Sequence, residues 1–152
     1  MDENQPLARP VKLTQVNALP APEQPRCGPD QLAVTLTPAK PEFGPDEMVT
    51  VISTVRNKTA APCYEASIRW SFSFKDSAGR DGIGQAAVAD YFRYVPFEPG
   101  ETRTQTGNWV QRSCTDSPPN CVPASTGDAT ASVRWDLGEG PVEATTSFRL
   151  LS

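Results

Sequence analysis

Apolar and polar residues alternate with a period of two through most of the chain after residue 30, which is the pattern of half-buried β-strands. The clearest example is the segment 65–74. Its apolar residues Ile68, Trp70, Phe72 and Phe74 share one face, and the polar residues Arg69, Ser71 and Ser73 occupy the other. The alternation predicts seven strands, at residues 31–38, 47–56, 65–74, 88–95, 102–110, 129–137 and 142–150.

The segment 47–56 alternates on both of its faces. Three valines share one face, and Met48, Ile52 and Thr54 share the other. A strand with apolar residues on both faces is typical of the interior of a sheet. We therefore expect a central strand that is partly buried on both sides.

Proline, glycine, asparagine and aspartate separate these strands, and no segment has the period of an amphipathic helix. Many short strands at close spacing predict an all-β fold, an immunoglobulin-like antiparallel two-sheet β-sandwich of about seven strands. The predicted core comprises Leu32, Val34, Val51, Val55, Ile68, Trp70, Phe72, Phe92, Trp109, Val133, Trp135 and Phe148.

The first 26 residues differ from the rest, because they carry five prolines and only scattered apolar residues. Such a segment buries too little apolar surface to offset the entropy of ordering, and proline favours extended geometry. We therefore interpret residues 1–26 as a stalk or linker and residues 27–152 as the β-sandwich domain. The alternative is a docked strand at residues 11–16, where apolar and polar residues also alternate.

Charge and composition exclude several classes of function. The 152 residues include 14 Lys and Arg, 18 Asp and Glu and no His, which gives a net charge of -4. An acidic chain is a poor ligand for nucleic acid. Without histidine, Ser-His-Asp and Cys-His catalysis and His-ligated zinc are excluded. We expect a protein that is not an enzyme and that has no cofactor and no bound metal.

Four cysteines, at positions 27, 63, 114 and 121, include no Cys-x-x-Cys pair, which favours disulfides over a zinc site. Of the three possible pairings we expect Cys114 with Cys121, because the proline-containing segment between them must turn back on itself, and Cys27 with Cys63 by elimination. Disulfides persist in oxidising compartments. We therefore expect an extracellular, periplasmic or cell-surface protein whose signal or anchor has been removed before Met1. Four reduced cysteines in a cytosolic protein are the alternative.

The segments DQLAVTLTP, FGPDEMVTVISTVRNKTAAPC, FEPGETRTQTGNW and ATASVRWDLGEGPVEA together resemble bacterial extracellular immunoglobulin-like modules related to CARDB-type cell-adhesion domains. The resemblance covers residues 30–150 and implies an exported binding or spacer domain without catalysis. Cys27 and Cys63 also resemble the cysteines of secreted actinobacterial lipoprotein-type domains, which supports their pairing. The chain departs from the adhesion modules in its long insertion at residues 111–128.

The segment CTDSPPNC at residues 114–121 resembles the inhibitory loop of Bowman-Birk serine-proteinase inhibitors, although it is shorter by one residue. The resemblance implies that Asp116 is the specificity residue and that the bond from Asp116 to Ser117 is the scissile bond. The alternative is a disulfide-closed surface hairpin without inhibitory activity.

Other polar residues are less distinctive. We interpret the carboxylates around the turn KDSAGRDG, which include Asp76 and Asp81, as solvated turn residues, and the sequon at Asn57 as a turn. Exposed aromatic residues are enriched at protein interfaces. The binding candidates are Tyr64, Tyr91, Arg93, Tyr94 and Phe97, together with Asp116 and Ser117.

The sequence therefore predicts an exported adhesion-type domain that recognises a protein or a cell-surface polymer. It binds no nucleic acid, and no segment of the given chain is apolar enough to insert into a membrane. Two alternatives stay open. One is a proteinase inhibitor that acts through residues 114–121, and the other is an extracellular sensor domain of a membrane-anchored signalling protein.

Overall fold

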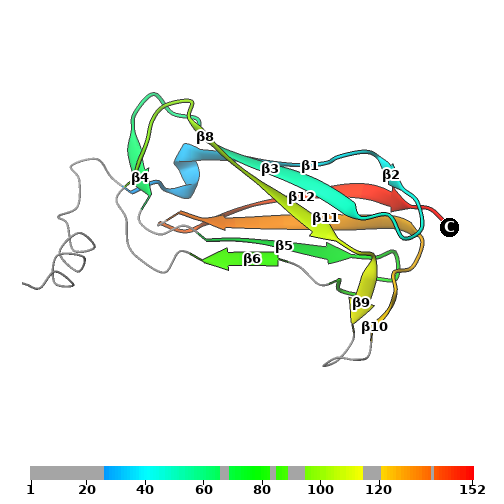
Figure 1. Ribbon diagram of the computed structural model, residues 1–152. Coiled ribbons are helices and arrows are strands. Elements are labelled where there is room, and N and C mark those ends of the chain that lie inside the picture. Colours follow the sequence, from blue (N-terminus) through cyan, green and yellow to red (C-terminus); the bar gives the residue numbers. More distant parts are fainter. Residues whose placement is uncertain (1–25, 66–68, 83–84, 89–94, 115–120, 138) are drawn as a thin grey trace, which may run out of the picture.

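The computed structural model describes residues 26–65, 69–82, 85–88, 95–114, 121–137 and 139–152 (Figure 1). Within these ranges strands dominate, and the helical structure is one short 3-10 turn. In chain order the elements are η1 (Pro29–Gln31), β1 (Leu32–Pro38), β2 (Glu42–Phe43), β3 (Val49–Asn57), β4 (Cys63–Glu65), β5 (Arg69–Lys75), β6 (Gln85–Val88), β7 (Val95–Phe97), β8 (Thr102–Trp109), β9 (Arg112–Cys114), β10 (Cys121–Pro123), β11 (Gly127–Asp136) and β12 (Pro141–Leu150).

Two larger sheets and two short ladders contain all of these strands. One sheet has the order β1-β3-β8 and the other has the order β2-β12-β11-β5-β6, while β9 pairs with β10 and β4 pairs with β7. All pairs are antiparallel except the two-residue contact of β2 with β12. The predicted all-β, mainly antiparallel fold is confirmed. Residues 89–94 of the strand predicted at 88–95 lie outside the described residues, and the additional strands are short segments.

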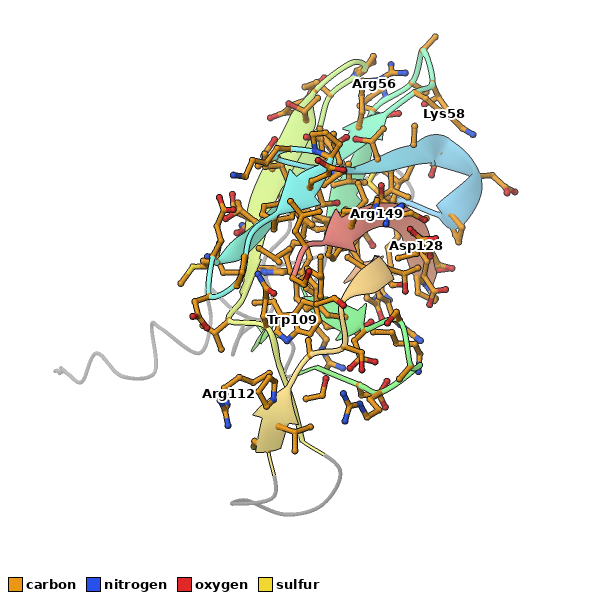
Figure 2. All side chains as sticks on the ribbon, turned by 90° about the vertical axis from the view of Figure 1, so that its right-hand side faces the viewer. Arg56, Lys58, Trp109, Arg112, Asp128 and Arg149 are labelled. Carbon is orange, nitrogen blue, oxygen red and sulfur yellow. A yellow bond between two sulfur atoms is a disulfide. The ribbon has the colours of Figure 1, made fainter. Side chains whose placement is uncertain are left out.

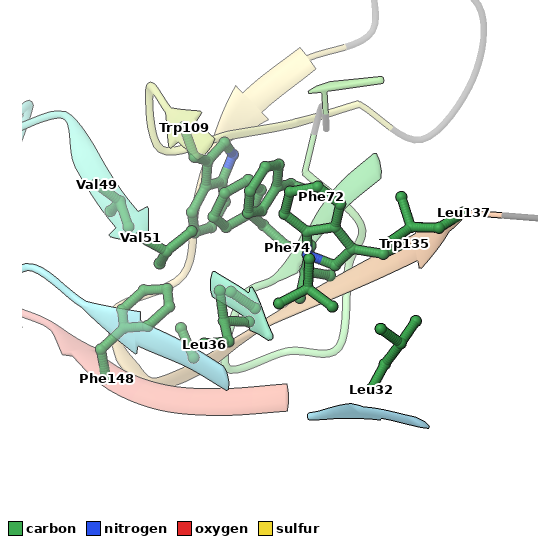
Figure 3. Close-up of a cluster of buried hydrophobic side chains, with 14 of the residues drawn as sticks. Leu32, Leu36, Val49, Val51, Phe72, Phe74, Trp109, Trp135, Leu137 and Phe148 are labelled. Carbon is green, nitrogen blue, oxygen red and sulfur yellow. The ribbon is translucent and has the colours of Figure 1, made fainter. Parts of the chain in front are cut away.

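The two larger sheets pack against each other through aromatic side chains. Phe74 of β5 stacks on Trp109 of β8, with ring centres 5.3 Å apart and planes at 18°. Trp135 of β11 donates from Nε1 to Ser53 Oγ of β3 over 2.8 Å. Figure 3 shows these rings among valines and leucines from both sheets. Each buried tryptophan removes roughly 150–250 Å² from water, so the rings supply much of the core.

Most of the predicted core is buried, and Val34 and Trp70 pack against it while partly exposed. Ile68 and Phe92 lie outside the described residues. The strand predicted at residues 47–56 is central, as expected, and Thr50 and Thr54 on its outer face are half-buried. The predicted burial is wrong for Met48 and Ile52, which are 51% and 38% exposed, because the second sheet covers only one face of β3.

The described chain begins beside β4, because Cys27 forms a disulfide with Cys63. The Cys27 N–H also donates to the Tyr64 carbonyl over 2.9 Å. The predicted pairing of these two cysteines is confirmed. Residues 1–25 lie outside the described residues, so the stalk interpretation remains a prediction.

Candidate functional site: the two ends of the molecule

The aromatic residues that we expected to be exposed are buried wherever the structure describes them. Tyr64 in β4 and Phe97 in β7 are 7% and 0% exposed, so the expectation that these two binding candidates are exposed is wrong. The reason is the β4–β7 ladder, which pairs Cys63 with Phe97 and joins the core through the disulfide to Cys27. The remaining aromatic-strand candidates, Tyr91, Arg93 and Tyr94, lie outside the described residues.

A buried ion pair lies beside Phe97. Glu65, at the end of β4, is 1% exposed, and Arg103 of β8 donates from Nη2 to its Oε2 over 2.5 Å. The same guanidinium lies 4.5 Å from the centre of the Phe97 ring and pairs with Glu101 at 2.9 Å. Burying a charged carboxylate costs a large free energy unless an opposite charge pairs with it. Arg103 therefore connects β8 to β4 and β7 as a structural residue.

Asn57, the acceptor of the sequon, is fully buried at the same end. Its Nδ2 donates to the carbonyls of Ala61 and Phe97, each over 2.9 Å. Its Oδ1 accepts from the Thr59 N–H and the Thr59 hydroxyl. These bonds use both ends of the amide, so Asn57 closes the turn after β3 and offers no amide to a glycan. The turn interpretation is confirmed.

The opposite end carries the β9–β10 hairpin, as Figure 2 shows by the positions of Lys58 and Arg112. The antiparallel register places Cys121 directly opposite Cys114, and Cys121 is disulfide-bonded. This backbone register is the one that the predicted disulfide between Cys114 and Cys121 requires. The loop between these cysteines lies outside the described residues, and with it Asp116 and Ser117.

A buried carboxylate, Asp76, anchors the base of this hairpin. Its Oδ2 accepts from the Ser113 hydroxyl in β9 over 3.3 Å and from the Ser125 N–H after β10 over 3.0 Å. Its Oδ1 accepts from the backbone N–H groups of Ala78 and Arg80 over 3.0 and 2.9 Å. One side chain therefore joins the end of β5 to both arms of the hairpin.

The electrostatics of Asp76 fit this anchoring role. Burial acts to raise the pKa of Asp76, but the N–H groups of Ser125 and Arg80 and the positive charge of Arg80 outweigh burial and hold the pKa below its usual value. The Arg80 Nε lies 3.1 Å from Asp76 Oδ2. An ionised carboxylate with this many donors is unsuited to general-base catalysis, because binding a proton would weaken every one of these bonds. The interpretation of Asp76 as a solvated turn residue is wrong.

Trp109 supports the hairpin from the core side. Its Nε1 donates to the Arg112 carbonyl over 2.9 Å, and the ring lies over Phe74. Gln111 turns the chain between β8 and β9 with a positive φ of 58°, and its Nε2 donates to the carbonyls of Gly44 and Glu47. The base of the hairpin is thus held by side chains from several distant parts of the sequence.

The other carboxylates have ordinary surface partners. Asp81 pairs with Lys75 at 2.7 Å, and both side chains are exposed. Glu143 lies 3.6 Å from Arg134 on the outer face of β11 and β12. The described part of the chain contains no group of three or more His, Cys, Asp or Glu residues arranged to hold a metal ion.

Surface grooves among the described residues include one beside β2 and β12 and one across β5 and β11. The larger is a shallow groove of about 370 Å³ beside β2 and β12, where Arg149 and Asp128 flank Phe148. The smaller, of about 200 Å³, crosses serines of β5 and β11 between Arg134 and Glu143. Neither contains a residue that the sequence singled out for binding.

Solved structures with a similar fold include the CARDB domain of a Pyrococcus furiosus protein, described in complex with di-metal ions. It is 15% identical, and the match covers 89% of this chain and 96% of that domain with a TM-score of 0.49. The chain is thus similar in structure to a CARDB domain, the type of domain that its sequence resembles. No protein-family model matches the chain, and no curated protein sequence matches it either.

Two other similar structures belong to enzymes. They are an alkylpurine DNA glycosylase of Pseudomonas fluorescens bound to abasic-site DNA (13% identity, TM-score 0.43) and a β-glucosidase of Erythrobacter marinus (15% identity, TM-score 0.48). The match covers 80% and 79% of this chain but only 31% and 15% of those chains.

These enzymes correct one expectation from the sequence. The chains with a similar segment include enzymes, so the prediction that the protein is not an enzyme is contradicted. A fold of this kind gives no ground for excluding catalysis. The match spans less than a third of each enzyme, and no activity of theirs is carried over to this chain.

Proposed function

We propose that this chain is an exported recognition domain that binds a protein or a cell-surface polymer through the end that carries the β9–β10 hairpin. The supporting observation is the anchoring of the hairpin base by Asp76, Ser113 and Trp109. A loop held on a fixed base loses less conformational entropy on binding than a loop on a mobile base. Loops at one end of a β-sandwich are also a common place for recognition.

The test is a comparison of matched surface variants. The full chain is measured for binding to a panel of purified envelope polymers and to intact bacterial cells, alongside Asp116→Ala combined with Ser117→Ala. We expect this double variant to bind at least about tenfold more weakly, as expected for residues at an interface hot spot. The control is Lys58→Ala, an exposed turn residue at the opposite end. Equal binding by the double variant and the wild type would contradict the use of this loop.

Export is the second part of the proposal. It is supported by the Cys27–Cys63 disulfide and by the absence of free cysteines among the described residues. Within those residues no helix has the length and apolar character needed to cross a bilayer. Thiol titration of unreduced, denatured protein provides the test. We expect no reactive thiol, and four reactive thiols in freshly purified material would contradict export.

One specific observation favours proteinase inhibition as a second candidate function. The β9–β10 ladder holds the ends of the loop 114–121 opposite each other, and Cys121 is disulfide-bonded. Inhibitory loops depend on such a closed base, because it holds the scissile bond in the protease-bound conformation. A panel of serine proteases that includes Asp- and Glu-specific enzymes tests this function. Inhibition that Asp116→Ala abolishes would support it, whereas rapid cleavage after Asp116 would exclude it.

A further inference from the structure

The outer face of the sheet β1-β3-β8 is rich in threonine and nearly free of charge. Its outward positions alternate with the buried ones and are exposed or half-buried, and Arg56 is the one charged residue among them. These positions are Ala33, Thr35, Thr37, Thr50, Ile52, Thr54, Arg56, Thr102, Thr104, Thr106 and Asn108. Depletion of charge distinguishes the centre of a protein interface from the remaining surface.

The outer face of the other large sheet is different. There β5, β11 and β12 present basic and acidic side chains in alternation, some of them in pairs such as Arg134 with Glu143. Its charged residues are Arg69, Lys75, Asp128, Arg134, Asp136, Glu143 and Arg149. The neutral character of the first face is therefore a local property and does not follow from the overall composition, in which 21% of residues are charged.

The neutral face ends at an open strand edge. The Asn57 N–H donates to the Glu101 carbonyl over 3.1 Å, so the alternation of an antiparallel ladder directs the backbone groups of Arg103, Gln105 and Gly107 toward β3. The backbone groups of Thr102, Thr104 and Thr106 then point away from β3. In the described part of the chain, no strand pairs with this edge of β8.

The other sheet edges carry features that limit further pairing, but β8 has few of them. β1 ends in Pro38, β2 has 2 residues and β6 has 4 residues. β8 has 8 residues with the sequence TRTQTGNW, which contains neither lysine nor proline. Its single charge, on Arg103, is neutralised by Glu65 and Glu101. A long uncharged edge is a template for pairing with another strand.

We propose that this edge of β8 pairs with β8 of a second copy of the chain, antiparallel and with the two-fold axis at Gln105. In this register Thr104 lies opposite Thr106 of the partner subunit, and the two exchange backbone hydrogen bonds. Arg103 lies opposite Gly107 of the partner subunit, so no like charges face each other. The two sheets β1-β3-β8 then form one continuous sheet with one neutral face.

A second copy suits this edge because threonine is self-complementary. A hydroxyl both donates and accepts, so a row of threonines can pair with an identical row without any countercharge. Threonine pairs on neighbouring strands also stabilise a sheet. The net charge of -4 makes two copies repel each other, and an edge whose single charge is already paired adds little to that repulsion.

The test is sedimentation velocity of the full chain from about 1 μM to about 1 mM, a range suited to an interface below the standard size. We expect a concentration-dependent dimer. The double variant Thr104→Lys with Thr106→Lys places lysines of the two copies opposite each other and should raise the dissociation constant of the dimer at least about tenfold.

The matched control is Thr35→Lys combined with Thr37→Lys, which adds the same charge to the exposed face of β1, at the opposite edge of the same sheet. The control should dimerise like the wild type.

A charge-swap experiment makes the register testable. Thr104→Glu with Thr106→Glu should be monomeric alone but should form a heterodimer when mixed with the double lysine variant, because each lysine then faces a glutamate. Amide hydrogen exchange of Thr102, Thr104 and Thr106 should slow as wild-type concentration rises. A monomeric wild type at the highest concentration, loss of the dimer in the β1 control, or absence of the heterodimer would each overturn the proposal. Binding of an extended peptide to β8 by a wild type that stays monomeric would assign the edge to another partner.

Discussion

Asp76, Asn57 and Glu65 are polar side chains that lie inside the molecule, and each joins segments that are distant in sequence. Asp76 accepts from Ser113 and Ser125, and Asn57 donates to Phe97. Removing such a side chain leaves the N–H or C=O groups that it satisfied buried without a partner, which costs more than the net value of the hydrogen bonds themselves. The two ends of the molecule are therefore sensitive to single substitutions.

Asp76→Ala should lower the free energy of unfolding by about 3 kcal/mol, because it leaves the N–H groups of Ser125, Ala78 and Arg80 without their acceptor. Urea denaturation at neutral pH measures the change. Asp81→Ala is the control, since it removes an exposed ion pair worth less than about 1 kcal/mol. Equal effects of the two substitutions would contradict the anchoring role of Asp76.

The lowered pKa of Asp76 also predicts a pH dependence. Since the folded-state pKa is depressed, the stabilisation from the ionised carboxylate is fully present above the ordinary pKa of about 3.9 and is lost as pH falls toward the folded-state pKa. Urea denaturation from neutral pH down into this acid range should show wild-type stability falling. The fall should be smaller in Asp76→Asn, which has no proton to take up. An unchanged acid profile in that variant would contradict the depressed pKa.

Gly107→Ala should destabilise the core by about 1–3 kcal/mol through overpacking. A Cβ at this position in β8 would lie 2.5 Å from Cγ of the Phe72 ring, which is itself fixed in the core. Thermal unfolding followed by circular dichroism measures the effect. Gly44→Ala is the matched control, because its Cβ would meet only the Glu47 carboxylate at 3.7 Å. If the two variants unfold at the same temperature, Phe72 does not pack against β8 as described.

Some of these residue roles could be predicted from the sequence and others could not. The turn at Asn57 was predictable, because its Thr59 partner is local. The local half of the Asp76 site was also detectable, since an aspartate that starts a turn commonly accepts from the N–H two residues later. The contacts with Ser113 and Ser125 span 37 and 49 positions, and no local pattern reports them.

At the scale of elements, alternation located β3, β11 and β12, because each has an apolar face that must be buried, whereas β8 contributes a single large apolar side chain, Trp109. β3, β8, β11 and β12 lie within two residues of the predicted segments. Alternation failed for β2, β4, β7, β9 and β10, which have 2 or 3 residues, too few to establish a period. Those short strands build both ends of the molecule, so the candidate site was less predictable than the sheets.

The Cys27–Cys63 disulfide should contribute about 3–4 kcal/mol to stability, because it closes a loop with a sequence separation of 36 in the unfolded chain. The double variant Cys27→Ser with Cys63→Ser isolates this bond from that of Cys121. Urea denaturation should give a midpoint well below that of the wild type. A midpoint unchanged from the wild type would mean that η1 and β4 are held together by their other contacts alone.

At the scale of the whole molecule, the two sheets differ in what they present to solvent. The β5-β11-β12 face is charged, and the β1-β3-β8 face is neutral. The hairpin lies at one end, and β4, which carries the disulfide from Cys63 to Cys27, lies at the other (Figure 1). The proposed recognition through the hairpin and the proposed pairing through β8 therefore use separate surfaces. Because β9 follows β8 directly and the proposed pairing is antiparallel, the two hairpins of a dimer would lie at its opposite ends.

The segment 1–26 is the remaining large feature, and trypsin distinguishes its two interpretations. Lys12 is the one site in residues 1–25 that trypsin cuts readily, because Pro10 follows Arg9. If the segment is a stalk, cleavage after Lys12 should proceed at the rate of the unfolded chain, and the cleaved protein should keep its melting temperature, since every described core residue lies at or after Cys27. If residues 11–16 instead dock as a strand, Lys12 should resist cleavage until the whole domain unfolds, and cutting there should lower the melting temperature.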